Sequence, residues 1–254
     1  MLTNRKDAYG HQLYDFFKGR PVVECVERDD GYIDPNPALP KYYLSGYKDW
    51  TSREKKAVRY VKGRVLDIGS GGGRWSLYLQ KKGYDVLGVD NSPLAVKVCK
   101  LRGLNKVMVK SISEIDSSLG RFDTILMIGN NFGLFGSFKQ ARQLLKRFYE
   151  ITSPGAHIIA ESLDIYKSPV DPLHRRYHSR NRRLGRMPGQ VRMRLRYRTF
   201  VTPWFDYLLV SKNQMRKILK GTGWKINRFI DSPGPAYAAI MEKDDSAEPS
   251  RKGS

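Results

Sequence analysis

The sequence predicts an α/β fold in which helices flank a mostly parallel central sheet, and three observations support this prediction. An apolar segment at 65–68 runs into a glycine-rich turn at 69–73, after which a helix begins. A second apolar segment ends on Asp90, which lies 17 residues beyond Gly73, the separation that one helix and one strand occupy. Strand and helix patterns then alternate as far as residue 160, as they do in βαβ units.

At 254 residues the chain is long enough for one sizeable α/β core. It contains no run approaching the roughly 20 apolar residues of a membrane span, so we expect a soluble, cytoplasmic protein that does not bind membranes. Cys25 and Cys99 are its only cysteines, and they fall in separate predicted segments. They suggest neither a disulfide framework nor a zinc site.

The net charge of +21 is unusual: the chain contains 46 Lys and Arg residues but only 25 Asp and Glu residues. Residues 164–202 hold 11 of the basic residues and two of the acidic ones, and so contribute +9. Such a balance favours an anionic partner, although it says nothing about the fold.

Residues 1–50 lack sustained periodicity but are rich in aromatic residues, and we expect them to form a cap that packs over the main domain. Tyr42 and Tyr43 of this cap are predicted to close one side of an acceptor pocket. The main domain is predicted to span 51–242, with an insertion at 162–210, and the polar residues 243–254 to form a disordered tail.

The elements of the main domain follow from cap and stop signals. Thr51 and Glu54 form a capping box that opens a helix ending near Gly63. Ser92 and Pro93 open another helix after the second strand. Strands are predicted at 65–68, 86–90, 106–110, 122–128, 157–160, 224–231 and 236–242, and the other main helices at 75–82, 138–152 and from 211 onward.

The glycine-rich turn does not fit the dinucleotide fingerprint G-x-G-x-x-G, because from Gly69 that pattern needs glycine where Arg74 stands. The pattern present is D-x-G-x-G-x-G, beginning at Asp67. Glycines free of Cβ atoms let a ligand approach the main chain. A carboxylate at Asp90 would arrive beside the turn and could accept hydrogen bonds from a ribose diol.

With Asp67, three glycines and Asp90 each at a strand end, the sequence resembles the class I S-adenosylmethionine-dependent methyltransferases. The resemblance implies a Rossmann-like fold with a mostly parallel seven-stranded sheet and S-adenosylmethionine as cofactor. Ser111 and Ile112 stand where the family often carries an acid near the adenine, so backbone groups and the Ser111 hydroxyl would replace it. The cofactor-binding residues implied are Asp67, Gly69, Ser70, Gly71, Gly73, Asp90, Asn91, Ser111, Ile112 and Asn130.

Asn130 and Asn131 follow the fourth strand, at the position which in the family lies under the methyl donor. The resemblance therefore makes them candidate catalytic residues, while the alternative is that they are turn residues. The segment contains no proline and no cysteine, so it matches neither the tetrapeptide associated with methylation of exocyclic base amines nor a cytosine carbon-5 methyltransferase. His157 is predicted to be a strand residue without a catalytic role.

The insertion contains a strand with period two at 190–202, whose partner is predicted at 204–210 after a turn at Pro203. Because it emerges at the carboxyl edge of the sheet, this hairpin is a candidate lid over the acceptor. One face carries Val191, Met193, Leu195 and Tyr197, and the other Arg192, Arg194, Arg196 and Arg198. We predict that Arg192, Arg194 and Arg196 bind the acceptor.

The segment at 174–183 precedes this strand and contains Tyr177 and His178, either of which could act as a general base. The alternative is that the segment is a solvated basic surface. His174 and His178 lie four residues apart, but no third ligand has suitable spacing, so no metal site is predicted.

The resemblance implies transfer of a methyl group from S-adenosylmethionine, and the basic insertion favours a small or medium-sized anionic acceptor. The first alternative is an RNA methyltransferase whose arginines hold phosphates. The second is a catalytically silent cofactor-binding scaffold.

Overall fold

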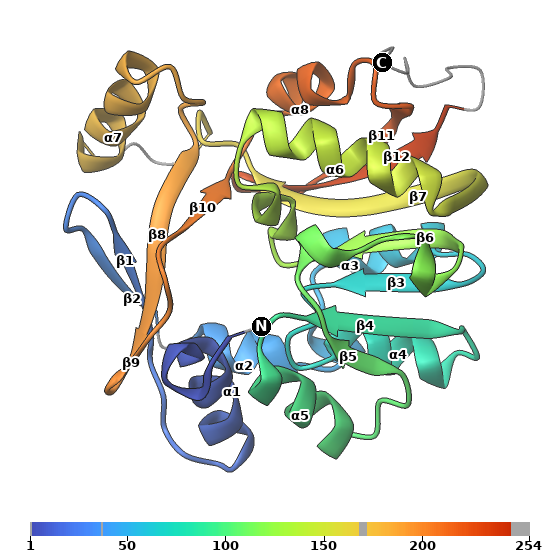
Figure 1. Ribbon diagram of the computed structural model, residues 1–254, viewed down its shortest axis with the longest axis horizontal. Helices are drawn as coiled ribbons and strands as arrows, with labels where there is room; N and C mark the ends of the chain where they lie inside the picture. Colours follow the sequence, from blue (N-terminus) through green and yellow to red (C-terminus); the bar gives the residue numbers. More distant parts are fainter. Residues whose placement is uncertain (1, 37, 168–171, 245–254) are drawn as a thin grey trace.

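The computed structural model describes residues 2–36, 38–167 and 172–244, which form two sheets (Figure 1). The larger sheet has seven strands in the order β11-β12-β7-β6-β3-β4-β5. The strands from β7 to β5 are parallel, whereas β12 and β11 are antiparallel to their neighbours. Their bounds are β3 Val65–Ile68, β4 Val86–Asp90, β5 Val107–Val109, β6 Phe122–Met127, β7 Thr152–Leu163, β11 Trp224–Asp231 and β12 Ala236–Lys243. The predicted α/β fold with a mostly parallel sheet is confirmed.

Helices cover both faces of this sheet, which explains why every residue of β3 and β4 is buried. One face packs against α6 (Phe138–Glu150) and α8 (Lys212–Leu219). The other packs against α3 (Ser52–Ala57) and α4 (Arg74–Lys81). The apolar residues between these layers form the two main parts of the core.

Side-chain caps set several helix starts as predicted. The Thr51–Glu54 capping box opens α3, and Ser92 accepts from the Ala95 N–H at the start of α5 (Pro93–Leu101). α3 is shorter than predicted and continues as a 3₁₀ turn, η3 (Val58–Tyr60). The other 3₁₀ turns are η1 Asn4–Lys6, η2 Tyr47–Asp49, η4 Ile112–Glu114, η5 Ser117–Leu119 and η6 Asn131–Phe135.

The second sheet stands beside the edge of the large sheet where β3 and β6 end (Figure 1). Its order is β10-β8-β1-β2, and β9 pairs with the far end of β8. The antiparallel pairing of β8 with β10 agrees with the predicted hairpin, but β8 ends at Tyr197 and turns through Arg198, whose φ is 52°. The bounds are β1 Glu24–Arg28, β2 Ile33–Asn36, β8 Gln190–Tyr197, β9 Phe200–Val201 and β10 Phe205–Leu208.

The N-terminal segment is more regular than its lack of periodicity suggested. It forms α1 (Ala8–Phe17), the β1–β2 hairpin and α2 (Leu39–Leu44). Asp7 caps α1 and also accepts from the hydroxyl of Ser92, so the starts of α1 and α5 are joined. Because β1 pairs with β8, the N-terminal segment and the insertion share one sheet.

The remaining helix, α7 (Pro172–Arg183), lies at one end of the second sheet (Figure 1). Among the described helices, none combines the length and apolar character needed to cross a membrane. The tail predicted to be disordered begins within β12, and its residues 245–254 lie outside the described residues.

Candidate active site

A cavity of about 1160 Å³ lies between the carboxyl ends of the central strands and the second sheet. Its walls include the glycine turn after β3, Asp90 at the end of β4, and residues from β1, β8 and β10. A pocket for one drug-sized ligand usually measures about 300–1,000 Å³. The cavity therefore has room for a cofactor together with a small second molecule.

The glycine turn presents bare main chain to this cavity. Gly69, Gly71 and Gly73 have φ angles of 69°, 53° and 75°, in the left-handed region that favours glycine. A Cβ atom on Gly71 would lie 2.5 Å from the hydroxyl oxygen of Tyr9. Of the predicted cofactor residues, all but Gly73 line the cavity: Asp67, Gly69, Ser70, Gly71, Asp90, Asn91, Ser111, Ile112 and Asn130.

Two buried carboxylates flank the turn. Asp67 accepts a hydrogen bond from the Ser76 hydroxyl at 2.6 Å, and Asp90 accepts from the backbone N–H groups of Gly71 and Ser92, each at 2.9 Å. Burial raises the pKa of both carboxyl groups to about 6. Since a carboxylate can accept about four hydrogen bonds, both retain capacity for a bound ligand.

Asn130 and Asn131, the predicted catalytic residues, both line the cavity. The amide of Asn131 donates to the carbonyl oxygens of Ile68 and Gly69 at 3.1 and 3.0 Å. Asn130 has a φ of 66°, and its backbone carbonyl accepts from the Tyr207 hydroxyl at 2.7 Å. The Asn131 side chain is thus committed to supporting the glycine turn.

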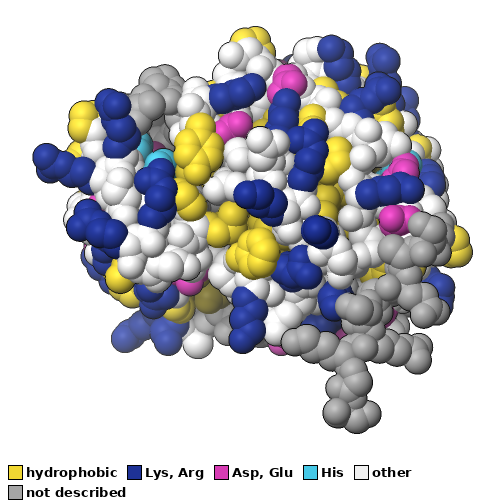
Figure 2. Space-filling model, turned by 90° about the horizontal axis from the view of Figure 1, so that it is seen from above, with side chains coloured by type: hydrophobic (Ala, Val, Ile, Leu, Met, Phe, Trp, Pro, Cys, Tyr) yellow, Lys and Arg dark blue, Asp and Glu magenta, His cyan; other side chains and the backbone are white. Residues whose placement is uncertain are grey.

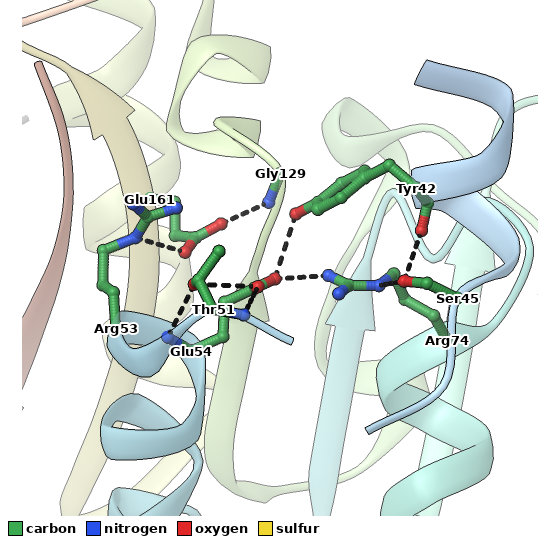
Figure 3. Close-up of polar contacts among 8 residues, drawn as sticks. All are labelled: Tyr42, Ser45, Thr51, Arg53, Glu54, Arg74, Gly129 and Glu161. Atoms are coloured by element: carbon green, nitrogen blue, oxygen red, sulfur yellow. Dashed lines mark hydrogen bonds and ion pairs between the residues drawn. The ribbon is translucent and has the colours of Figure 1, made fainter. Parts of the chain in front are cut away.

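Arg74, the first residue of α4, connects the turn to the N-terminal cap (Figure 3). Its guanidinium forms an ion pair with the buried Glu54, donates to the Ser45 hydroxyl at 3.0 Å and lies 4.1 Å from the ring centroid of Tyr42. The Tyr42 hydroxyl donates to Glu54 at 3.1 Å. Burial acts to raise the pKa of Glu54, but Arg74 and Thr51 together lower it.

Glu161 of β7 forms a second buried ion pair on the same wall (Figure 3). Its carboxylate accepts from Arg53 Nε at 2.9 Å and from the backbone N–H of Gly129 at 2.8 Å. Burial raises the pKa of Glu161, and Arg53 opposes this shift. The sequence patterns did not single out this residue, because its partners come from distant elements.

The second sheet turns its apolar face toward the cavity. Val191, Met193 and Leu195 of β8 line it, as do Val26 and Arg28 of β1. The β1–β8 register places Val26 opposite Leu195 and Arg28 opposite Met193, so these residues share the inner face. The guanidinium of Arg28 is paired with Asp30, at 2.7 Å.

The arginine row lies mainly on the outer face, which places Arg194 and Arg196, though not Arg192, away from the cavity where they were predicted to bind the acceptor. Arg194 and Arg196 are absent from the cavity lining within the described chain, and both pair with Glu27 of β1. Arg192 reaches the cavity lining, but its guanidinium lies 3.6 Å from Asp206, while Arg198 pairs with Asp15 at 3.3 Å. The alternation of the strand puts the apolar residues inward and the guanidiniums of Arg194 and Arg196 next to Glu27 on the outer face.

Tyr177 and His178, the predicted general bases, occupy different environments. The hydroxyl of Tyr177, which is only 2% exposed, donates to Asp29 at 2.6 Å and accepts from the Arg192 backbone N–H at 3.0 Å. Burial and Asp29 raise its pKa to about 12, so the phenol stays protonated at neutral pH. His178 lines the cavity, and burial, together with the nearby His174 and Arg182, lowers its pKa. Only His178 is therefore suited to accept a proton.

The cavity also contains residues that the sequence analysis missed. Tyr9 and Tyr207 line it together with the predicted Tyr42 and Tyr43. Glu24, at the start of β1, accepts from the Tyr43 hydroxyl at 3.1 Å and from the side-chain amide of Gln12. The strand that carries Glu24 is only five residues long, too short for its alternation to have been recognised.

Among the described residues, no cluster of three or more His, Cys, Asp or Glu side chains could hold a metal ion.

Comparison with known proteins agrees with this geometry. A family model described as a methyltransferase domain matches residues 42–227. Glycine/sarcosine N-methyltransferases from Halorhodospira halochloris and Parasynechococcus marenigrum are 23% and 24% identical to the chain, over 77% and 58% of its length and 80% and 52% of theirs. A crystal structure of an S-adenosylmethionine-dependent methyltransferase from Bacteroides fragilis, in complex with S-adenosyl-L-homocysteine, superposes with a TM-score of 0.80 at 25% identity, covering 96% of this chain and 97% of that one.

Proposed function

The chain belongs to the S-adenosylmethionine-dependent methyltransferase family, and we propose that its acceptor is a small molecule enclosed between the two sheets. The observation that carries this proposal is the cavity itself. It continues from the glycine turn to the inner face of the second sheet, so the acceptor would meet the cofactor in a space walled by protein. Much of the rate of a group transfer can come from holding the two reactants in such a site.

We assign the cofactor to the side of the cavity formed by the glycine turn. Asp90 would accept hydrogen bonds from the ribose hydroxyls, Asp67 and Gly69 would lie near the amino-acid portion, and Ser111 and Ile112 near the adenine. The fit is supported by the main chain of the glycine turn, which lines the cavity at Gly69 and Gly71, and by two buried carboxylates that lack a cationic partner among the described residues. The cofactor supplies an electrophilic methyl group, and the protein supplies position and charge.

A small acceptor is also consistent with the relatives, whose names identify them as enzymes that methylate the nitrogen of glycine and sarcosine. The case for an anionic acceptor rested on the arginine row. Since Arg194 and Arg196 pair with Glu27 on the outer face, that support is removed.

RNA is the second candidate acceptor, and the surface charge favours it. Figure 2 shows many Lys and Arg side chains and few acidic ones on the face where α7 and α8 lie in Figure 1. The exposed basic residues of α6, α8 and the turn after α8 are Lys139, Arg147, Arg216, Lys217 and Lys220. These residues are absent from the described lining of the cavity, so RNA bound there would not by itself enter the methyl-transfer site.

Transfer of tritium from S-adenosyl-[methyl-³H]methionine tests the proposal. The protein is incubated separately with a small-molecule fraction of a cell extract and with total RNA, and the label in each is counted. We expect label in small molecules and not in acid-precipitable RNA, and the opposite result contradicts the proposal. Asp90→Asn should reduce transfer at limiting cofactor concentration. The matched variant Asp85→Asn, which changes an exposed ion pair with Lys106 outside the cavity, should retain it.

A further inference from the structure

Glu24 is a buried carboxylate on the acceptor side of the cavity, and the structure leaves its charge uncompensated. Its side chain is 4% exposed, and its two hydrogen-bond donors, Gln12 and Tyr43, are both neutral. No described Lys, Arg or His forms an ion pair with it. The charged neighbour that affects it is Asp34, which has the same sign, and burial raises the pKa of Glu24.

The other buried acids of the cavity are accounted for. Glu161 is paired with Arg53, while Asp67 and Asp90 flank the glycine turn to which we assign the cofactor. Glu24 lies instead on the second sheet, at the start of β1 and on its inner face with Val26 and Arg28. It is therefore the buried acid placed to meet the acceptor.

Aromatic rings surround this carboxylate. Tyr43 contacts Glu24 through its hydroxyl and meets the ring of Tyr9 edge-on at 5.3 Å. The hydroxyl of Tyr9 covers Gly71, so the rings of Tyr9 and Tyr43 together extend from the glycine turn to Glu24. Tyr42 lies 5.9 Å from Tyr43, and Tyr207 completes the wall. A carboxylate among aromatic rings is an arrangement that attracts cations, because the ring faces carry partial negative charge.

We propose that this site takes an amine as the methyl acceptor, with Glu24 contacting the amine nitrogen. The inference rests on the proposed function and adds the chemical class of the acceptor. A buried charge without a partner is unfavourable, and a cationic ligand would remove this penalty on binding. The aromatic wall would contact the hydrocarbon part of the same ligand.

The same carboxylate would favour the reaction as well as binding. The amine must first release one proton to water, so that a lone pair is free. Its lone pair then forms the new carbon–nitrogen bond, the electron pair of the broken carbon–sulfur bond stays with sulfur, and the positive charge moves to nitrogen. A fixed negative charge beside the nitrogen stabilises this developing charge.

The test compares benzylamine, a cation at pH 7, with benzyl alcohol, its neutral analogue, by titration calorimetry on protein saturated with S-adenosylhomocysteine. We expect the wild type to bind benzylamine at least about tenfold more tightly. Glu24→Gln should remove this preference with unchanged S-adenosylhomocysteine affinity. Glu27→Gln is the matched control, because it makes the same change three residues away on the outer face of β1, and it should keep the preference.

The outcomes separate the two proposals. If the wild type does not bind benzylamine more tightly than benzyl alcohol, or binds neither compound, the amine inference is wrong whatever the variants do. A preference that survives in Glu24→Gln removes Glu24 from the site. If S-adenosylhomocysteine binds and tritium enters only alcohols, thiols or acids, methyl transfer stands and the amine inference falls. Failure to bind S-adenosylhomocysteine would instead remove the proposed function.

Discussion

Replacing Arg74 by Met should destabilise the protein strongly, because it leaves Glu54 charged and without a cation in a buried position. The side chains of Glu54 and Arg74 are 0% and 8% exposed. Breaking a buried pair by removing one partner costs about 3–5 kcal/mol. For a domain of this size each kcal/mol lowers the melting temperature by about 2–4 °C, so the variant should melt about 6–20 °C below the wild type.

The assay is a double-mutant cycle of Arg74→Met and Glu54→Gln, with free energies of unfolding measured in urea. In the Glu54→Gln background residue 54 carries no charge, so Arg74→Met should cost at least about 1 kcal/mol less than it does in the wild type. Lys106→Met is the control, since Lys106 and its partner Asp85 are 60% and 44% exposed, and exposed pairs contribute only about 0–1 kcal/mol.

The pH dependence provides an independent check. The pKa of Glu54 is lowered in the folded protein from its ordinary value of 4.5, so its contribution to stability is present above that value and is lost as the pH falls through the folded pKa. Arg74→Met should reduce this acid-induced loss. The reasoning would be refuted if the two substitutions were additive within about 0.5 kcal/mol and Arg74→Met cost no more than Lys106→Met.

Three further predictions follow from the site. Asp90→Asn should cost about 1.5–3 kcal/mol of S-adenosylhomocysteine affinity in calorimetry. Because the pKa of Asp90 is raised to about 6, the affinity of the wild type should fall below that pH, while the affinity of the variant should not change. An unchanged affinity in the variant would exclude Asp90 from the site. Tyr177→Phe should cost about 1–3 kcal/mol of stability with kcat unchanged, since it removes the hydrogen bond to Asp29 and the one from the Arg192 N–H. A lower kcat at unchanged stability would instead indicate that Tyr177 acts as a base. Arg194→Gln with Arg196→Gln should leave both cofactor and acceptor affinity unchanged, and weaker acceptor binding would return these residues to the site.

The parts of the fold that could be predicted from the sequence are those specified by neighbouring residues. β4 has the predicted bounds, and the caps at Thr51 and Ser92 are present. The glycine turn was predictable because left-handed backbone requires glycine at particular positions, whatever lies around it. Local chemistry therefore located the cofactor side of the cavity.

The second sheet was not predictable in this way, because it joins segments that are far apart in the chain. β1 pairs with β8, so that Glu27 meets Arg194, and no local pattern links these residues. A single sequence contains no signal for such a pairing beyond the β-forming character of each strand. Tyr42 and Tyr43 were predicted to line the cavity, but the part of its wall that β1 contributes, including Glu24, depends on this pairing and could not be derived.

A period-two strand defines two faces but does not say which one meets the ligand. The arginines of β8 looked like the functional face because charge is conspicuous in a sequence, yet β1 supplies Glu27 to pair with them. Glu24 and Glu27 are three residues apart, so in a strand their side chains point to opposite faces. One is paired with arginines outside, and the other lies in the cavity with no cation. The pairing of β1 with β8 therefore decides which of these two acids lines the cavity.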